Sequence, residues 1–199
     1  MYNKEKLERS LTLLGERLEI AKSPLLNLLV CGGSALIITG LVNRPTTKDV
    51  DVVALGYPKA DGGFDIKESR PFPEVLQKAA QQVARDLGMP EDWLNPGPTD
   101  MVRFGLPDGF KGRLVTRKYG RALTIHFLGR YDQIHLKVYA AVDQGPGKHP
   151  DDLLALKPTP GEIESAARWS MTHDDSAGFK MILKDMLRKI GYESVADRI

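Results

Sequence analysis

Two aspartates one residue apart, Asp49 and Asp51, are the residues whose type and spacing point most directly to chemistry. They stand in a run of β-forming residues that predicts a strand over 49–55. Because side chains alternate along a strand, both carboxylates face the same side. Two adjacent carboxylates repel each other, and a hard divalent cation such as Mg²⁺ or Mn²⁺ relieves that repulsion. The pair therefore predicts a metal site; the alternative is a solvated strand face.

A glycine turn lies upstream of the aspartates. The apolar segment 25–30 predicts a short buried strand, and Gly32 and Gly33 allow a sharp turn with close approach of a ligand. Ser34 is expected to be the N-cap of a buried helix over 35–41. A strand, a glycine turn and a helix N-terminus together favour phosphate binding. The alternative is a turn that only changes the direction of the chain.

The two motifs together, GGSAL at 32–36 and RPTTKDVD at 44–51, resemble the nucleotidyltransferase superfamily that includes DNA polymerase β. Within it they are similar to the bacterial AbiEii-like abortive-infection toxins and related nucleotidyltransferases. The resemblance implies that the glycine-serine turn holds the triphosphate and that Asp49 and Asp51 hold Mg²⁺. The nucleotide-binding residues that it implies are Gly32, Gly33, Ser34, Arg44 and Lys48.

Two more residues enter as catalytic candidates through the same resemblance. Lys137 stands in an apolar helix predicted over 131–142, where a buried ammonium needs a partner. The resemblance implies that Lys137 contacts a nucleotide phosphate, and Lys137→Met is then expected to keep thermal stability. Asp152 matches the last acid of an R-D-x-x-D-L motif, although His149 replaces its first Asp. The alternatives are a Lys that reaches solvent and an acid favoured by the helix dipole.

One departure from the superfamily concerns a third carboxylate on a later strand. The strands predicted over 113–118 and 122–128 contain no Asp or Glu. Asp132 or Asp152 could take that place, or the base is absent. A non-catalytic nucleotide-binding or protein-interaction module on the same fold therefore stays open beside the enzyme. An antitoxin-like partner protein is weaker, because such a role does not need Asp49 and Asp51.

The favoured expectation is a Mg²⁺-dependent transferase that moves a nucleoside monophosphate from NTP to an acceptor hydroxyl or phosphate. The acceptor is left open among tRNA, a protein and a small molecule. The resemblance also implies a toxin-type enzyme with a cognate antitoxin as partner.

Composition indicates which partners and which cell compartment to expect for the protein. The 199 residues carry 28 basic and 26 acidic side chains, and a net charge of +2 gives no general attraction to nucleic acid. The single cysteine, Cys31, fits a reducing cytoplasm. No apolar run approaches the ~20 residues of a membrane span, so no membrane partner is expected.

The expected fold is α/β, with a small mixed sheet flanked by helices and a C-terminal helical segment. We expect a core with its N-terminal helix over 1–157 and a helical segment over 158–199. Helical periodicity and capping signals predict further helices over 3–21, 73–87, 160–172 and 176–190.

Three further features are ambiguous. Segment 56–70 is predicted to be a loop, because it is rich in Gly, Pro and charge. Trp93 either belongs to a Trp-Leu-Asn motif of the resembled families or anchors a loop on the core. Basic residues of the 113–128 hairpin either contact a phosphate backbone or protect a sheet edge.

Overall fold

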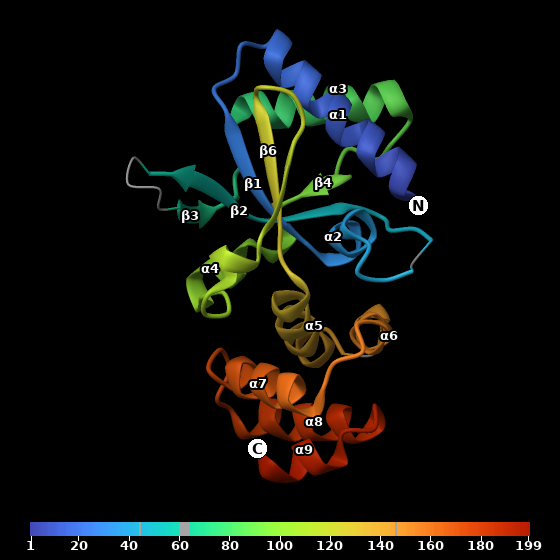
Figure 1. Ribbon diagram of the computed structural model, residues 1–199, viewed down its shortest axis with the longest axis vertical. Helices are drawn as coiled ribbons and strands as arrows, with labels where there is room; N and C mark the ends of the chain where they lie inside the picture. Colours follow the sequence, from blue (N-terminus) through green and yellow to red (C-terminus); the bar gives the residue numbers. More distant parts are fainter. Residues whose placement is uncertain (44, 60–63, 146) are drawn as a thin grey trace. The chain divides into compact units, whose positions relative to one another are not determined.

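The computed structural model describes residues 1–43, 45–59, 64–145 and 147–199. These residues form two compact units, Met1–Leu128 and Gly129–Ile199 (Figure 1). The boundary expected after residue 157 falls inside the second unit, between two of its helices.

The first unit is built on a mixed sheet. Its strands follow the order β3-β2-β1-β6-β5, and β4 pairs with β2 as well. β1 is antiparallel to β2 and parallel to β6. Helices flank this sheet, so the predicted α/β class is confirmed. The strands are β1 (Leu26–Cys31), β2 (Val50–Pro58), β3 (Phe64–Glu68), β4 (Leu94–Asn95), β5 (Val115–Lys118) and β6 (Leu123–Phe127).

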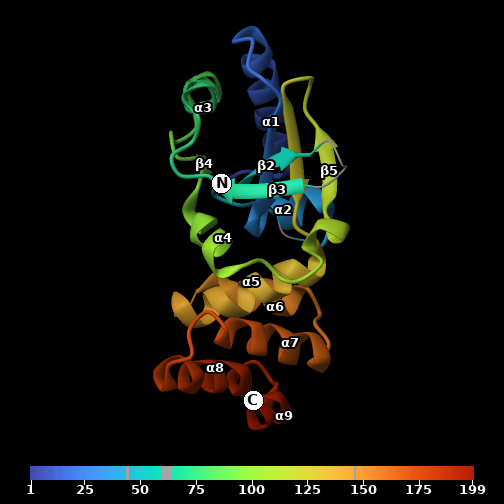
Figure 2. The same ribbon diagram turned by 90° about the vertical axis from the view of Figure 1, so that its left-hand side faces the viewer.

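The helices of the first unit pack through apolar stripes. Leucines at helical spacing on α1 are fully buried, as the sequence periodicity predicts. Figure 2 shows α1 between α3 and the β5–β6 hairpin. The elements are α1 (Lys4–Ile20), α2 (Gly32–Thr39), α3 (Glu74–Leu87) and α4 (Met101–Phe104), with 3₁₀ turns η1 (Gly97–Asp100) and η2 (Phe110–Arg113).

The loop predicted over 56–70 is wrong for residues 56–58 and 64–68, which are in strands, while residues 60–63 lie outside the described part of the chain. β2 continues to Pro58, and β3 pairs with it in antiparallel register. Gly56 permits this pairing, because a Cβ at that position would collide with the ring of Phe64. One of the glycines that suggested a loop therefore makes room for a cross-strand aromatic side chain.

The second unit is helical. Its helices are α5 (Arg130–Asp143), α6 (Lys148–Ala155), α7 (Pro160–Met171), α8 (Ala177–Lys189) and α9 (Glu193–Arg198). α7 begins with a capping box formed by Thr159 and Glu162, with Pro160 in the first turn. α5 packs against α6, α7 and α8, which explains why α5 and α6 group with the C-terminal helices. The sequence patterns did not predict α9, a helix of six residues. No helix in the described ranges has the length and apolar character needed to cross a membrane.

Candidate functional site

The glycine turn forms the junction between β1 and α2. β1 ends at Cys31, and α2 begins at the next residue, Gly32. The prediction that Ser34 is the N-cap is wrong: Cys31 takes the cap position, and Ser34 stands in the first turn. The buried Ser34 hydroxyl donates a hydrogen bond to the Cys31 carbonyl oxygen at 3.4 Å. The backbone N–H groups at the N-terminus of α2 therefore lie at the end of β1, a central strand of the sheet.

Gly32 brings Asp51 to that junction. Its φ of +70° lies in the left-handed region, where side chains are disfavoured. A Cβ on Gly32 would also collide with the Asp51 carboxylate. Asp51 pairs in register with Cys31 across β1 and β2. The structure therefore brings together Asp51 and the glycine turn, as the sequence motifs predict.

Asp49 stands directly before β2, and one of its carboxylate oxygens has an unusual environment. Oδ1 is buried and has no hydrogen-bond partner among the described residues. Leaving a carboxylate oxygen buried and unpaired is costly, so such an atom calls for an explanation such as a bound ion. A cation bound at this oxygen would compensate its buried negative charge.

A Mg²⁺ ion fits the donors present. Proteins commonly bind Mg²⁺ through one or two carboxylates and complete the shell with water and substrate phosphates. Asp51 supplies one carboxylate beside a helix N-terminus suited to phosphate, and Asp49, two residues earlier in the chain, offers a second. No group of three or more His, Cys, Asp or Glu side chains is arranged for a metal within the part of the chain that the structure describes. The donor set thus suits an ion shared with a nucleotide and not a protein-only metal site.

Tyr2 is a neighbour of the site that the sequence patterns missed. It is only 3% exposed, and its backbone pairs with that of Thr47, two residues before Asp49. Burial, followed by the negative charges of Asp92 and Asp49, raises the pKa of Tyr2. The Tyr2 phenol therefore stays protonated near both carboxylates, and the N-terminus helps to hold the segment that leads into Asp49.

Asn95 is a second neighbour that local patterns could not reveal. β4 pairs with β2 in parallel, and Asn95 lies in register with Asp51. Paired residues of neighbouring strands share a face, so Cys31, Asp51 and Asn95 form a row across three strands. The Asn95 side-chain oxygen accepts a hydrogen bond from the Gly97 N–H at 2.9 Å.

The Trp93 side chain holds β4 in place. It is 1% exposed, and Nε1 donates a hydrogen bond to the Ala80 carbonyl oxygen of α3 at 3.0 Å. The interpretation of Trp93 as an anchor of this segment on the core is confirmed. The Trp-Leu-Asn sequence therefore positions Asn95 by packing.

Arg44 and Lys48 are the two remaining nucleotide-binding candidates. Arg44 lies outside the described residues. Lys48 is exposed and directly precedes Asp49. The role of both residues stays a prediction from the resemblance.

Lys137 and Asp152 form a buried ion pair inside the second unit. Lys137 Nζ donates to Asp152 Oδ2 at 2.7 Å, and the two side chains are 5% and 8% exposed. Lys137 also lies 3.4 Å from His149 Nδ1, and His149 Nε2 lies 2.9 Å from Gln144 Oε1. The alternatives of a solvent-reaching Lys and a plain first-turn acid do not hold. The partner that the buried Lys requires is Asp152, which joins α5 to α6.

The third carboxylate is not found on the strands. Neither β5 nor β6 carries an Asp or Glu. Asp132, the other substitute considered, is fully buried on α5 and, like Asp152, belongs to the second unit.

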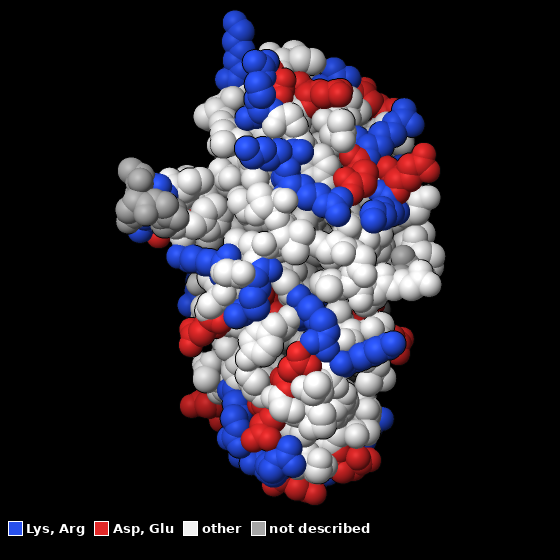
Figure 3. All heavy atoms as spheres, viewed as in Figure 1, with Lys and Arg blue, Asp and Glu red and all other residues white. Residues whose placement is uncertain are grey.

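Two basic residues of the β5–β6 hairpin, Arg117 and Arg121, make ion pairs with α1. Arg117 pairs with Glu8 of α1 and donates to the Ile38 carbonyl oxygen. Arg121 pairs with Glu19 at 3.5 Å. Figure 3 shows acidic side chains interspersed among the basic ones on the face in view. The hairpin therefore supports the interpretation of a charged sheet edge better than that of a nucleic-acid surface.

The chain was compared with family models, with curated proteins and with solved structures, and none of the three comparisons found a match.

Proposed function

We propose that this protein is a Mg²⁺-dependent nucleotidyltransferase, which moves a nucleoside monophosphate from NTP to an acceptor hydroxyl or phosphate. The observation that carries the proposal is the packing of the Asp51 carboxylate against left-handed Gly32 at the N-terminus of α2. A phosphate-binding element and a metal-binding carboxylate then share one small region.

The phosphate-binding part is the first turn of α2. Backbone N–H groups in the first turn of a helix lack partners within the helix, and the helix dipole favours an anion there. Gly32 and Gly33 lack side chains that would keep phosphate oxygens from these groups. The Ser34 hydroxyl faces the Cys31 carbonyl, so we assign the role of Ser34 to its backbone N–H.

Asp49 and Asp51 would hold the metal. Bound there, Mg²⁺ would neutralise phosphate charge and lower the pKa of the acceptor oxygen. The orphaned Oδ1 of Asp49 supports this role, because a cation would compensate a buried oxygen that has no protein partner among the described residues.

A non-catalytic nucleotide-binding module is the second candidate. It is favoured by the lack of Asp and Glu on β5 and β6, since a two-carboxylate site lacks the group that would take the acceptor proton. Such a module would bind the metal and NTP at the same residues without transfer. A protein partner, such as a cognate antitoxin, belongs to either candidate.

The deciding experiment combines binding and transfer. The protein is incubated with each labelled NTP, Mg²⁺ and either total RNA or total protein, and label transferred to the macromolecule is counted. Binding of each NTP with Mn²⁺ is measured by calorimetry. Asp51→Asn is the test variant, and Asp65→Asn on exposed β3 is its matched control.

Three results separate the candidates. Transfer by the parent and by Asp65→Asn, with loss in Asp51→Asn, supports the enzyme and names the acceptor class. NTP binding that depends on Asp51, without transfer in any mixture, supports the binding module. Absence of NTP binding by the parent would remove both candidates.

A further inference from the structure

Three polar side chains on neighbouring strands of the first unit are connected by hydrogen bonds. The Thr116 hydroxyl of β5 lies 2.8 Å from Nδ1 of His126 on β6, and Nε2 of His126 lies 3.0 Å from Oδ1 of Asn27 on β1. Asn27 is only 6% exposed, His126 is partly buried, and Thr116 is exposed. A buried amide is thus connected through an imidazole to a hydroxyl at the surface.

The amide of Asn27 fixes which nitrogen of His126 carries the proton. A side-chain amide oxygen only accepts hydrogen bonds, so Nε2 of the neutral ring is the protonated nitrogen. Nδ1 is then free to accept the hydrogen bond that the Thr116 hydroxyl donates. A hydroxyl, a base within about 2.6–3.2 Å and a third group that orients the base are the features of an activated nucleophile.

The Phe64 ring contributes to a neutral His126. It crosses Gly56, where a Cβ would collide with it, and meets the His126 ring edge-on with 4.8 Å between the ring centroids. Burial lowers the pKa of His126 from its ordinary value of 6.5. The imidazole is therefore unprotonated at neutral pH and able to take a proton.

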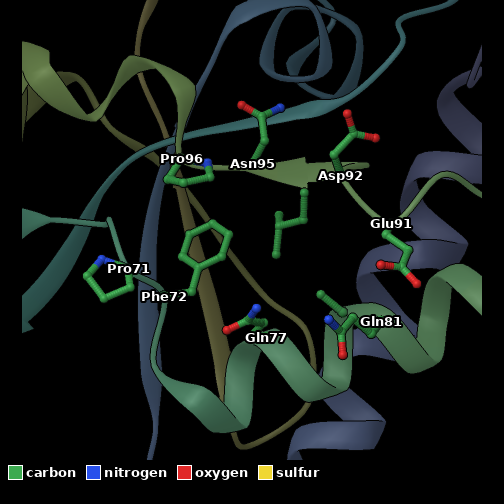
Figure 4. A pocket seen from close by; sticks show the side chains of 10 residues that line it. Pro71, Phe72, Gln77, Gln81, Glu91, Asp92, Asn95 and Pro96 are labelled. Atoms are coloured by element: carbon green, nitrogen blue, oxygen red, sulfur yellow. The ribbon is translucent and has the colours of Figure 1, made fainter.

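The Thr116 hydroxyl lies on the same face of the sheet as Asp51. Thr116 pairs with His126, and His126 pairs with Leu29 of β1. Cys31, two residues further along β1, pairs with Asp51. Paired residues share a face, and so do alternate residues of one strand. The opposite face packs against α1 and α3 in the core, and the hollow between α3 and β4 lies on that side (Figure 4).

Thr116 lies too far from Asp51 to react with a nucleotide held in the same molecule. β1 and β6 stand between β2 and β5, so three strand spacings, or roughly 14 Å, separate the two residues. Thr116 is exposed on an edge strand, where a second copy of the chain can approach it. Exposed Lys118 shares the face of Thr116 and brings positive charge that is complementary to nucleotide phosphates.

We propose that Thr116 is the acceptor hydroxyl of the nucleotidyl transfer and that a second copy of the chain supplies the NTP. The inference rests on the proposed function and names its acceptor. Oγ1 of Thr116 forms a bond to the α-phosphorus, the bond between the α-phosphate and pyrophosphate breaks, and the hydroxyl proton passes to Nδ1 of His126. β5 and β6 offer no carboxylate to take that proton, and His126 provides the base from the acceptor side.

The test follows label from NTP onto the protein itself. The chain is incubated with Mg²⁺ and each α-labelled NTP, without RNA or another protein, and labelled residues are located by mass spectrometry. The variants are Thr116→Val, Thr116→Ser, His126→Gln and the control Thr172→Val. Thr172 is also an exposed threonine beside a histidine, but its hydroxyl donates to the Trp169 carbonyl oxygen.

We expect label at position 116 in the parent, in Thr116→Ser and in Thr172→Val, and none in Thr116→Val. His126→Gln should be labelled more slowly by on the order of 10²-fold or more, the scale of a lost general base. Thermal unfolding checks that His126→Gln is folded. Should it not fold, Thr116→Val carries the test, because its substitution is at an exposed position.

A mixture of two variants tests transfer between copies. Asp51→Asn lacks a metal ligand and keeps the acceptor, whereas Thr116→Val keeps the NTP site and lacks the acceptor. We expect no label on either variant alone. In the mixture, label should appear on Asp51→Asn, which an affinity tag distinguishes from its partner. An unlabelled mixture would overturn the role of the second copy.

Two results overturn the acceptor assignment while the proposed function stands. One is transfer to RNA or to another protein by a parent that carries no label on Thr116. The other is labelling of Thr116→Val at the level of the parent, which places the acceptor at another residue. NTP binding without transfer to any acceptor overturns the enzyme itself, and the acceptor assignment with it.

Discussion

Two features of the structure disfavour any side chain at position 32. The φ of Gly32, +70°, costs an L-amino acid about 1–2 kcal/mol, and a Cβ there would meet the carboxylate of Asp51. Gly40 provides a comparison, since its φ of +73° is nearly the same and nothing lies within 4 Å of an added Cβ.

Gly32→Ala should therefore weaken nucleotide binding as well as lower the stability of the protein. We expect both Gly32→Ala and Gly40→Ala to lower the melting temperature by a few degrees through backbone strain. Only Gly32→Ala should also displace Asp51 and weaken Mn²⁺–NTP binding by about tenfold or more. Calorimetry and thermal unfolding of the two variants decide this, and equal NTP affinity in both would separate Gly32 from the nucleotide site.

The negative charge of Glu162 contributes to the stability of the second unit. Hydrogen bonds from Arg130, together with those from Thr159, lower the pKa of Glu162. A depressed folded-state pKa means that the stabilisation is complete above the ordinary Glu pKa of about 4.3. It is lost as the pH falls below that value through the folded-state pKa.

Glu162→Gln should remove this pH-dependent part. At pH 7 we expect a loss on the order of 1 kcal/mol, or about 2–4 °C in the melting temperature. The difference between variant and parent should shrink as the pH falls from 5 to 3, because the parent then loses the same charge. Thermal unfolding across this range measures it, with Glu193→Gln in α9 as control. A difference that stays constant with pH would contradict the assignment.

At the scale of elements, α5 and α6 are joined by the buried pair of Lys137 and Asp152. The sequence-based expectation that Lys137→Met keeps stability took no account of this partner. Removing one member of a buried ion pair leaves the other charge without compensation, which costs about 3–5 kcal/mol. Replacing both members with apolar groups is often neutral.

Lys137→Met should consequently destabilise the protein, and Lys137→Met/Asp152→Leu should recover most of the loss. Denaturant unfolding of the two single variants and the double variant gives the coupling between the residues. Additive losses would mean that the pair is not coupled. The double variant, because it stays folded, is also the protein in which nucleotidyl transfer can test the role of Lys137.

The whole molecule divides its candidate residues between two units. Asp49, Asp51 and the glycine turn belong to Met1–Leu128, whereas Lys137 and Asp152 belong to Gly129–Ile199. Hydrogen exchange can report which of them respond to a nucleotide.

We expect Mn²⁺–NTP to slow amide exchange in the first turn of α2, at the start of β2 and around β4. Peptides from α8 and α9 serve as the internal control and should not change. Slower exchange in α5 and α6 would support the predicted contact of Lys137 with phosphate. Protection confined to the second unit would contradict the placement of the nucleotide site in the first.

Local patterns were enough for the longer helices and for the site motifs. The leucine spacing of α1 and the capping box of α7 involve residues three or four positions apart, so the sequence itself contains the interacting partners. The same holds for Gly32 and Asp51 as candidate types, because a missing side chain and a carboxylate in a strand are visible without a fold. What each residue contacts is not visible in this way.

The tertiary structure decided the contacts that join distant segments. Asn95 reaches the row of Asp51 only because β4 pairs with β2, and β3 exists because its backbone completes hydrogen bonds on the edge of β2. Lys137 finds its counter-charge on another helix. Such pairings depend on backbone hydrogen bonds and on desolvation of charge between remote segments, so local sequence determined the chemical groups of this protein and only the fold determined their partners.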